Sequence, residues 1–220
     1  MTRVLQAGRK GPQSGTTRSI VVFLHGYGAN GADLLGLADP LAEHLPDTLF
    51  VAPDAPETIP GMPIGLQWFP IPWIDGSSEE ESERGMMSAV DDLNAFLDAL
   101  MVDEDVLPEQ VVLFGFSQGT MMALHVAPRR EDPVAGVVAF SGRLLRPEVL
   151  ADEVQSRPPV LLVHGDADDV VPPDEVITWA ETLQPRPDLV VLPEVGHFFH
   201  GHLVDLRSIV ANHVSAFLEH

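Results

Sequence analysis

The amino-acid sequence predicts an α/β fold, a mostly parallel central sheet with helices on both faces. Apolar runs of strand length recur along the 220 residues, and segments with a helical pattern fill most of the gaps between them. This alternation is typical of parallel sheets that are covered on both sides. We expect strands at residues 20–24, 49–52, 111–114, 137–140, 160–163 and 189–192. We expect helices at residues 33–45, 80–101, 120–127, 173–183 and 203–218.

Residues 1–220 are expected to form a single domain. The hydrophobic content of 45% is enough for one substantial core, and the length lies within the range of one domain. The sequence contains no internal repeat, and no linker divides it into two cores. Because the core takes up nearly the whole chain, we expect no separate lid domain.

Charge and composition disfavour several classes of function. The chain has 12 Lys and Arg residues against 33 Asp and Glu residues, and its net charge of −21 opposes binding to nucleic acid and to anionic membranes. No run reaches the roughly 18 apolar residues of a membrane-spanning helix, so we expect no stable membrane insertion. The polar N-terminus has no signal-peptide centre, which predicts a cytoplasmic location. The chain has no cysteine, so any nucleophile must be an oxygen or a nitrogen.

After the second expected strand, residues 53–76 form an unusual segment. Six of them are proline, and the segment also holds Trp68, Phe69 and Trp73, a mixture that predicts neither helix nor central strand. One interpretation is an ordered surface loop whose aromatic side chains cover the sheet. The other is an apolar wall over a binding site, with Trp68 and Phe69 as substrate-binding residues. Exposed aromatic side chains here are also a candidate homodimer contact.

The third expected strand leads into a serine between two glycines. Residues 111–114 have the length and β-branched content of a buried strand, and a helical pattern at residues 120–127 runs until Pro128. A strand-turn-helix context around G-x-S-x-G is where a strained nucleophilic serine sits, which makes Ser117 the candidate nucleophile. The glycines suit such a turn, because a Cβ at position 115 or 119 would crowd the neighbouring strand and helix.

A serine hydroxyl needs a base to take its proton, and the base needs a carboxylate to orient it. Among nine histidines, His197 is the best candidate base, because it follows Gly196 at the exit of the last expected strand. We expect His164 to fix its own loop by hydrogen bonds. His200 and His202 lie close to His197, but no carboxylate stands beside them on the loop, so we expect no metal site.

Three carboxylates compete for the role of the acid. Asp166, Asp168 and Asp169 follow the fifth expected strand, at the same edge of the sheet as Ser117 and His197. Their spacing alone does not separate them. The order serine, acid, histidine is the one that nucleophile-elbow hydrolases use.

A competing interpretation comes from the glycines after the first expected strand. Gly26, Gly28 and Gly31 satisfy the dinucleotide fingerprint G-x-G-x-x-G, and Asp54 follows the next strand, where a ribose-binding carboxylate would fall. Against it, residues 30–33 read as a loop with a late helix start, and the candidate serine, acid and base stay unexplained. A dinucleotide-binding oxidoreductase is therefore a remote alternative.

Five landmarks in order resemble the phospholipase and carboxylesterase family of α/β hydrolases, which includes the acyl-protein thioesterases. They lie at residues 24–28, 67–69, 115–119, 164–172 and 196–197. The resemblance implies an α/β-hydrolase fold, and we expect a serine ester hydrolase that requires no cofactor. The family's His-Gly-x-x-Asp pattern falls on Asp168 as the acid. The resemblance also implies an oxyanion hole formed by the backbone N–H groups of Tyr27 and Gln118.

We therefore expect a serine carboxylesterase that hydrolyses short- to medium-chain acyl esters through Ser117, His197 and Asp168, with an acyl-enzyme intermediate. Within the family, an acyl-protein thioesterase or a lysophospholipase on the same site stays open. A catalytically silent binding protein on the same fold is a further alternative, because sequence alone does not establish geometry.

Overall fold

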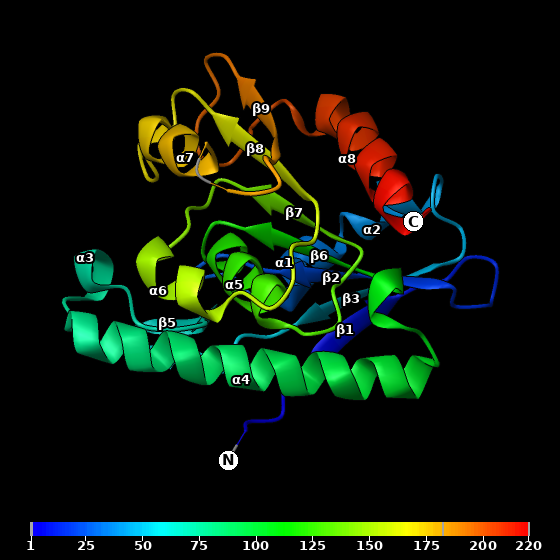
Figure 1. Cartoon of the computed structure of the whole chain (residues 1–220), viewed down its shortest axis with the longest axis horizontal. Coiled ribbons are helices and arrows are strands. Elements are labelled where there is room, and N and C mark those ends of the chain that lie inside the picture. The colour runs from blue at the N-terminus through cyan, green and yellow to red at the C-terminus, as the bar shows by residue number, and fades with distance from the viewer. Residues whose placement is uncertain (1, 182, 220) are drawn as a thin grey trace.

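The computed structural model describes residues 2–181 and 183–219. They are built around a seven-stranded sheet, and helices surround it on both sides (Figure 1). The strand order is β1-β3-β2-β6-β7-β8-β9, and all neighbouring strands are parallel except β1, which pairs antiparallel with β3. The strands are β1 (Ala7–Lys10), β2 (Ser19–Leu24), β3 (Thr48–Pro53), β6 (Val111–Phe116), β7 (Gly136–Phe140), β8 (Val160–Gly165) and β9 (Asp188–Leu192).

The six expected strands are confirmed, and β1 is an addition. Three of its four residues, AGRK, are exposed, so it lacks the apolar run by which a buried strand is recognised. It lies at the edge of the sheet, where one side of the strand has no neighbour. Its antiparallel direction also sets it apart from the parallel strands that the alternating pattern predicts.

Helices cover both faces of the sheet, as expected. They are α1 (Gly31–Leu35), α2 (Ala38–Ala42), α3 (Pro72–Asp75), α4 (Glu79–Glu104), α5 (Gln118–Val126), α6 (Pro147–Glu153), α7 (Pro173–Ala180) and α8 (Leu203–Leu218), with 3-10 turns η1 (Pro108–Gln110) and η2 (Ala127–Arg129).

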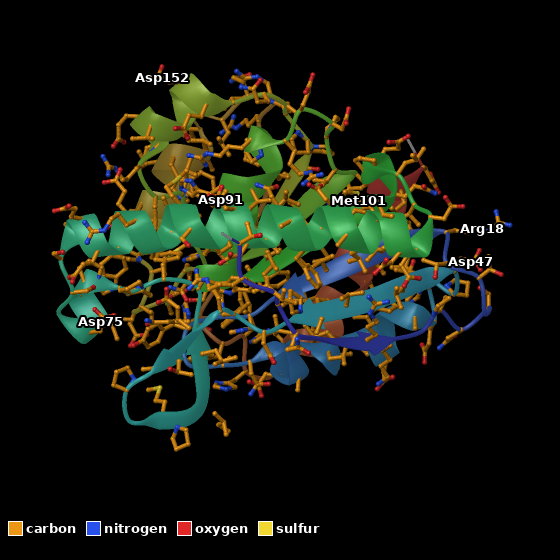
Figure 2. All side chains as sticks on the ribbon, turned by 90° about the horizontal axis from the view of Figure 1, so that it is seen from below. Arg18, Asp47, Asp75, Asp91, Met101 and Asp152 are labelled. Atoms are coloured by element: carbon orange, nitrogen blue, oxygen red, sulfur yellow. The ribbon has the colours of Figure 1, made fainter. Side chains whose placement is uncertain are left out.

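Alternating strand residues contact different sets of helices. In β2, Val22 and Leu24 belong to a core cluster with α4, α5 and α7, whereas Val21 and Phe23 belong to a cluster with α2 and α8. This is the period-two alternation of a strand buried on both faces. Figure 2, the view from below, shows α4 crossing the middle of the picture, with Asp91 and Met101 labelled on it.

The expected helix at residues 33–45 is two short helices instead. The first, α1, ends at Leu35, and α2 begins at Ala38. Pro40 has no backbone N–H and its ring crowds the preceding turn, so a continuous helix through this position is disfavoured. We also did not predict α6, which begins with Pro147 at its first position.

The segment at residues 53–76 contains a separate two-stranded hairpin, β4 (Glu57–Ile59) and β5 (Met62–Gln67), followed by α3. The prediction of no central strand holds, but the prediction of no helix is wrong over one turn. Pro72 starts α3, a position where the missing N–H of proline is tolerated. Trp73 on this helix is 53% exposed, and the homodimer contact stays a prediction.

Candidate active site

Ser117 sits at a sharp turn between β6 and α5, with φ 53° and ψ −113°. A positive φ is uncommon for a residue with a side chain, and such strain typically costs about 1–3 kcal/mol. Hydrogen bonds from Ser117 N to Phe140 O (2.8 Å) and from Met121 N to Ser117 O (3.2 Å) hold the turn. The strain therefore coincides with the candidate nucleophile, as the sequence predicts.

The two glycines of the motif lie where no side chain fits. A Cβ on Gly115 would lie 2.5 Å from the Cα of Thr120, and one on Gly119 would lie 1.9 Å from the carbonyl oxygen of Leu24. The predicted crowding is confirmed. The absence of side chains lets α5 begin directly over the ends of β2 and β6.

His197 lies in the loop between β9 and α8, and its ring faces Ser117. Its Nε2 is 3.1 Å from Ser117 Oγ, and its Nδ1 is 2.8 Å from Asp168 Oδ2. The hydroxyl of Ser141 donates to the carbonyl oxygen of His197 (2.8 Å), which fixes the backbone of the loop. The histidine is only 5% exposed, so its orientation is held by packing as well as by hydrogen bonds.

Of the three carboxylates that spacing did not separate, Asp168 is the one in contact with His197. It is 5% exposed, and its Oδ1 accepts hydrogen bonds from Val170 N (2.9 Å) and Val171 N (2.8 Å). Asp169 is exposed, and Asp166 accepts instead from Glu194 N (2.6 Å).

Hydrogen bonding keeps Asp168 ionised in spite of its burial. Burial alone would raise the pKa of Asp168, but the hydrogen bonds from His197, Val171 and Val170 outweigh it and lower the pKa below 3.8. A carboxylate only accepts hydrogen bonds, so Nδ1 of His197 carries a proton and Nε2 is the acceptor for the serine hydroxyl.

His164 supports the acid from the neighbouring strand β8. Its Nε2 is 2.9 Å from Val171 O, to which it donates, and 3.4 Å from Asp168 Oδ2. Burial lowers the pKa of His164, which keeps the ring neutral. The prediction that His164 fixes its loop by hydrogen bonds is confirmed.

Two backbone N–H groups near Ser117 are available for a ligand. Within residues 2–181 and 183–219, no acceptor pairs with the N–H of Tyr27 or Gln118. The neighbouring Gly28 N donates to Leu66 O, and Leu66 N donates to Ala29 O, each at 2.9 Å. Strand β5 therefore holds the loop that carries Tyr27.

Trp68 and Phe69 pack in the core cluster, which agrees with the interpretation that the aromatic side chains of this segment cover the sheet and does not support their assignment as substrate-binding residues. Their side chains are 0% and 1% exposed. Gln118 clamps this segment, because its Oε1 accepts from Trp68 N (2.9 Å) and its Nε2 donates to Phe69 O (2.7 Å). Both residues therefore support the first turn of α5 rather than face solvent.

The indole of Trp68 continues this network to the loop before Tyr27. Its Nε1 donates to His25 O (2.9 Å), and the ring of His25 bonds to Gly26 O (2.8 Å) and accepts from Ala55 N (3.0 Å). Burial lowers the pKa of His25, which suits a neutral ring with one donor and one acceptor. Sequence reasoning missed this network, because nothing local in the chain links residues 25, 68 and 118.

The dinucleotide-like glycines have a structural role. Gly31 N donates to Asp54 Oδ1 (2.8 Å), and Asn30 and Asp33 form a capping box at the start of α1. Two carboxylates thus already occupy the N-terminus of α1, where a pyrophosphate would have to bind. Their negative charge opposes such a ligand.

No group of three His, Cys, Asp or Glu side chains suited to a metal ion occurs in the described part of the chain. A separate search of the same residues finds no helix long and apolar enough to cross a membrane.

Two of the depressions in the described structure lie against opposite faces of the sheet. One, of about 270 Å³, is lined mainly by apolar residues, including Phe116 and Phe198. The other, of about 770 Å³, lies between α4 and α7 and contains Arg143, whose guanidinium stacks over Trp73 (4.5 Å) and pairs with Glu175 (2.7 Å). The segment at residues 53–76, one interpretation of which was a wall over a binding site, contributes Trp73 to the second depression, and no sequence motif indicated the first.

A parallel sheet with helices on both faces, and a serine at a strained strand-to-helix turn, define the α/β-hydrolase class of protein. The sequence model of the Phospholipase/Carboxylesterase family matches residues 12–206. The chain belongs to this family, and it is therefore a serine hydrolase of the carboxylic ester hydrolase kind.

Individual relatives are consistent with this family. Acyl-protein thioesterase 1 of Saccharomyces cerevisiae is 32% identical over 165 residues, which cover 70% of this chain and 72% of the yeast protein. Acyl-protein thioesterase 1 of Mycosarcoma maydis is 32% identical over 176 residues and 73% of each chain. The crystal structure of esterase PE8 superposes with a TM-score of 0.90 at 36% identity, covering 98% of this chain and all of that one.

Proposed function

We propose that the protein is a serine carboxylesterase that hydrolyses short- to medium-chain acyl esters through a Ser117–His197–Asp168 triad. The observation that carries the proposal is the continuous hydrogen-bond chain from Ser117 Oγ to His197 Nε2 (3.1 Å) and from His197 Nδ1 to Asp168 Oδ2 (2.8 Å). Base and orienting acid both lie within the reach that general-base catalysis requires.

Acylation begins when Ser117 Oγ attacks the ester carbonyl carbon and His197 Nε2 takes the hydroxyl proton. The charged imidazolium is stabilised by ionised Asp168. The bond between the carbonyl carbon and the alcohol oxygen then breaks. His197 returns the proton to that oxygen, so the alcohol leaves and the acyl group stays on Ser117.

Deacylation repeats the sequence with water. His197 takes a proton from water, the hydroxide attacks the acyl carbon, and the proton returns to Ser117 Oγ as the acid leaves. The N–H groups of Tyr27 and Gln118 bind the oxyanion of both tetrahedral intermediates. Each such donor is typically worth a factor of about 10² to 10³ in rate. Every proton transfer has a residue to carry it, so the mechanism uses no cofactor.

A thioester is the second candidate substrate at the same site, and a lysophospholipid is a third. The thioester is favoured by the 32% identical yeast relative, whose name is acyl-protein thioesterase 1. The oxygen ester is favoured by the 36% identical solved structure, whose name is esterase. All three reactions use the same acyl-enzyme, so the site geometry serves each of them.

The test compares matched butyryl and octanoyl esters of nitrophenol with S-acyl thioesters and lysophosphatidylcholine, for the wild type and Ser117→Ala. We expect kcat/KM to be highest for the oxygen esters, and Ser117→Ala to lower kcat by a factor of about 10⁴ to 10⁶. A preference for long S-acyl chains or lysophosphatidylcholine would assign the other substrates. Unchanged turnover in Ser117→Ala would exclude the triad.

A further inference from the structure

The apolar pocket of about 270 Å³ lies on the side of the sheet that α2 and α8 cover. Its volume is close to the lower end of the range for small-molecule sites. Helix α1, the turn before α2, helix α8 and the strand and loop ends at the active site all contribute to its walls. The wall includes Leu34 of α1, Phe116 of β6 and Phe198 of the loop before α8.

Two aromatic rings connect this pocket to the candidate base. The ring of Phe116 lies 5.2 Å from the ring of His197, and the ring of Phe198 lies 5.0 Å from it, measured between centroids. Phe116 directly precedes Ser117 in the chain, and Phe198 directly follows His197. The pocket therefore begins one ring away from the imidazole.

The lining selects an apolar group. Among the lining residues whose side chains the structure describes, only Asp33 and Arg207 are charged. Asp33 accepts a hydrogen bond from Asn30 N (2.9 Å), and Arg207 lies 3.9 Å from Glu43 in an ion pair. The other described lining residues are aliphatic, aromatic or proline, so over most of its wall the pocket offers a buried hydroxyl or charge no partner in exchange for water.

Proton transfer determines which part of an ester, the alcohol or the acyl group, lies next to the apolar pocket. His197 must return its proton to the alcohol oxygen, so that oxygen has to come within about 2.6–3.2 Å of Nε2. The alcohol group therefore points from the carbonyl carbon toward His197. The acyl group points from the carbonyl carbon in the other direction. The depression that contains Arg143 lies against the face of the sheet opposite the apolar pocket.

We propose that the apolar pocket binds the alcohol part of the substrate, so that the enzyme prefers esters of medium-length apolar alcohols. This inference rests on the proposed ester hydrolysis. Each methylene that enters the pocket raises kcat/KM by about fourfold, the factor that corresponds to the burial of one CH₂ group. Every alkyl acetate forms the same acetyl-enzyme. Where deacylation limits kcat, kcat is therefore the same for all alkyl acetates, and the preference for the alcohol appears in kcat/KM.

The experiment measures acid release from two isomer series, alkyl acetates from methyl to octyl and methyl alkanoates from acetate to octanoate. The pocket is narrowed by Leu34→Trp. The matched control is Leu35→Trp, since Leu35 is the next residue of α1 and packs against the same core cluster without lining the pocket. Circular dichroism and thermal melting check that both variants fold.

We expect kcat/KM of the wild type to rise from methyl to hexyl acetate. We expect Leu34→Trp to lower kcat/KM for hexyl acetate by about tenfold or more and to change kcat/KM for methyl hexanoate little. We expect Leu35→Trp to have wild-type kcat/KM for both substrates. A loss confined to methyl hexanoate would overturn the inference, because the pocket would then hold the acyl chain. Equal effects of the two variants would also overturn it. Wild-type enzyme that hydrolyses neither series would instead overturn the proposed function itself, and the inference with it.

Discussion

Asp168 differs from its neighbours in what surrounds the carboxylate. Two backbone N–H groups and His197 surround the Asp168 carboxylate, whereas Asp169, the next residue, is exposed. A sequence pattern that places three aspartates within four positions cannot distinguish them, because the direction of each side chain depends on the turn after β8. The family's His-Gly-x-x-Asp pattern supplied the choice that spacing could not.

We predict that Asp168→Asn lowers kcat by about 10⁴-fold, because an amide in place of the carboxylate favours the wrong tautomer of His197. Asp169→Asn is the matched control and should keep nearly full activity. The measurement is kcat on a nitrophenyl ester for both variants. If Asp169→Asn were the more damaging change, Asp168 would not be the acid.

Ser117 and His197 were predictable from the sequence because strand ends and glycines mark them. The place of Trp68 and Phe69 was less predictable, for a physical reason. The sequence pattern left two interpretations of this segment open, and it did not show that Gln118 and His25 bind the segment from two distant parts of the chain. The pocket lining was also out of reach, because Leu34, Phe116 and Leu206 meet only after the chain has folded.

At the scale of elements, the sequence predicts the buried strands well and the short or edge elements poorly. The six apolar runs are confirmed because burial on both faces requires continuous apolar residues. Strand β1 and helix α6 have no such requirement. The break between α1 and α2 is local, and Pro40 was a signal for it that the helical pattern around it concealed.

The close packing of α5 on the ends of β2 and β6 gives a prediction for Gly119. A Cβ there would overlap the carbonyl oxygen of Leu24 (1.9 Å), so we expect Gly119→Ala to destabilise the fold by roughly 3 kcal/mol or more. The measurement is the free energy of unfolding of both proteins from urea denaturation.

Gly36 is the matched control for this substitution. It has helical φ and ψ, and a Cβ there would meet nothing within 4 Å. Gly36→Ala should leave stability unchanged or raise it by roughly 0.4–1 kcal/mol. Equal losses in the two variants would mean that the elbow is not as tightly packed as the structure indicates.

At the scale of the whole molecule, we propose that residues 1–220 form one domain. One sheet carries both the N-terminal strand β1 and the C-terminal strand β9, and Figure 1 shows helices from both halves of the chain around it. The expected result is a single urea transition, with tryptophan fluorescence and far-UV circular dichroism giving the same midpoint. Two separate transitions would indicate two folding units.

The buried side chain of His125 makes the free energy of unfolding depend on pH. Burial and the neighbouring Arg129 cation lower the pKa of His125 from 6.5 to about 4. Its Nε2 donates to Leu145 O (2.7 Å), and its Nδ1 accepts from Arg129 (2.7 Å), so the folded state holds the neutral ring. Between pH 6.5 and 4 the unfolded chain binds the extra proton, and stability is therefore lost as the pH falls through this window.

We predict that the wild type loses about 2 kcal/mol more than His125→Gln when the pH falls from 7 to 5. The glutamine keeps one donor and one acceptor without titrating in this range. His44→Gln, at an exposed position, is the control and should follow the wild type. A pH dependence that is the same in all three proteins would rule out His125 as a source of the effect.

The central claim is that Ser117 becomes acylated during turnover. Its most direct test is mass spectrometry of enzyme quenched in acid while it hydrolyses nitrophenyl butyrate, followed by peptide mapping. The account predicts one butyryl group on the peptide that contains Ser117, removed by hydroxylamine and absent in Ser117→Ala. Butyryl on another residue, or unchanged turnover in Ser117→Ala, would contradict it.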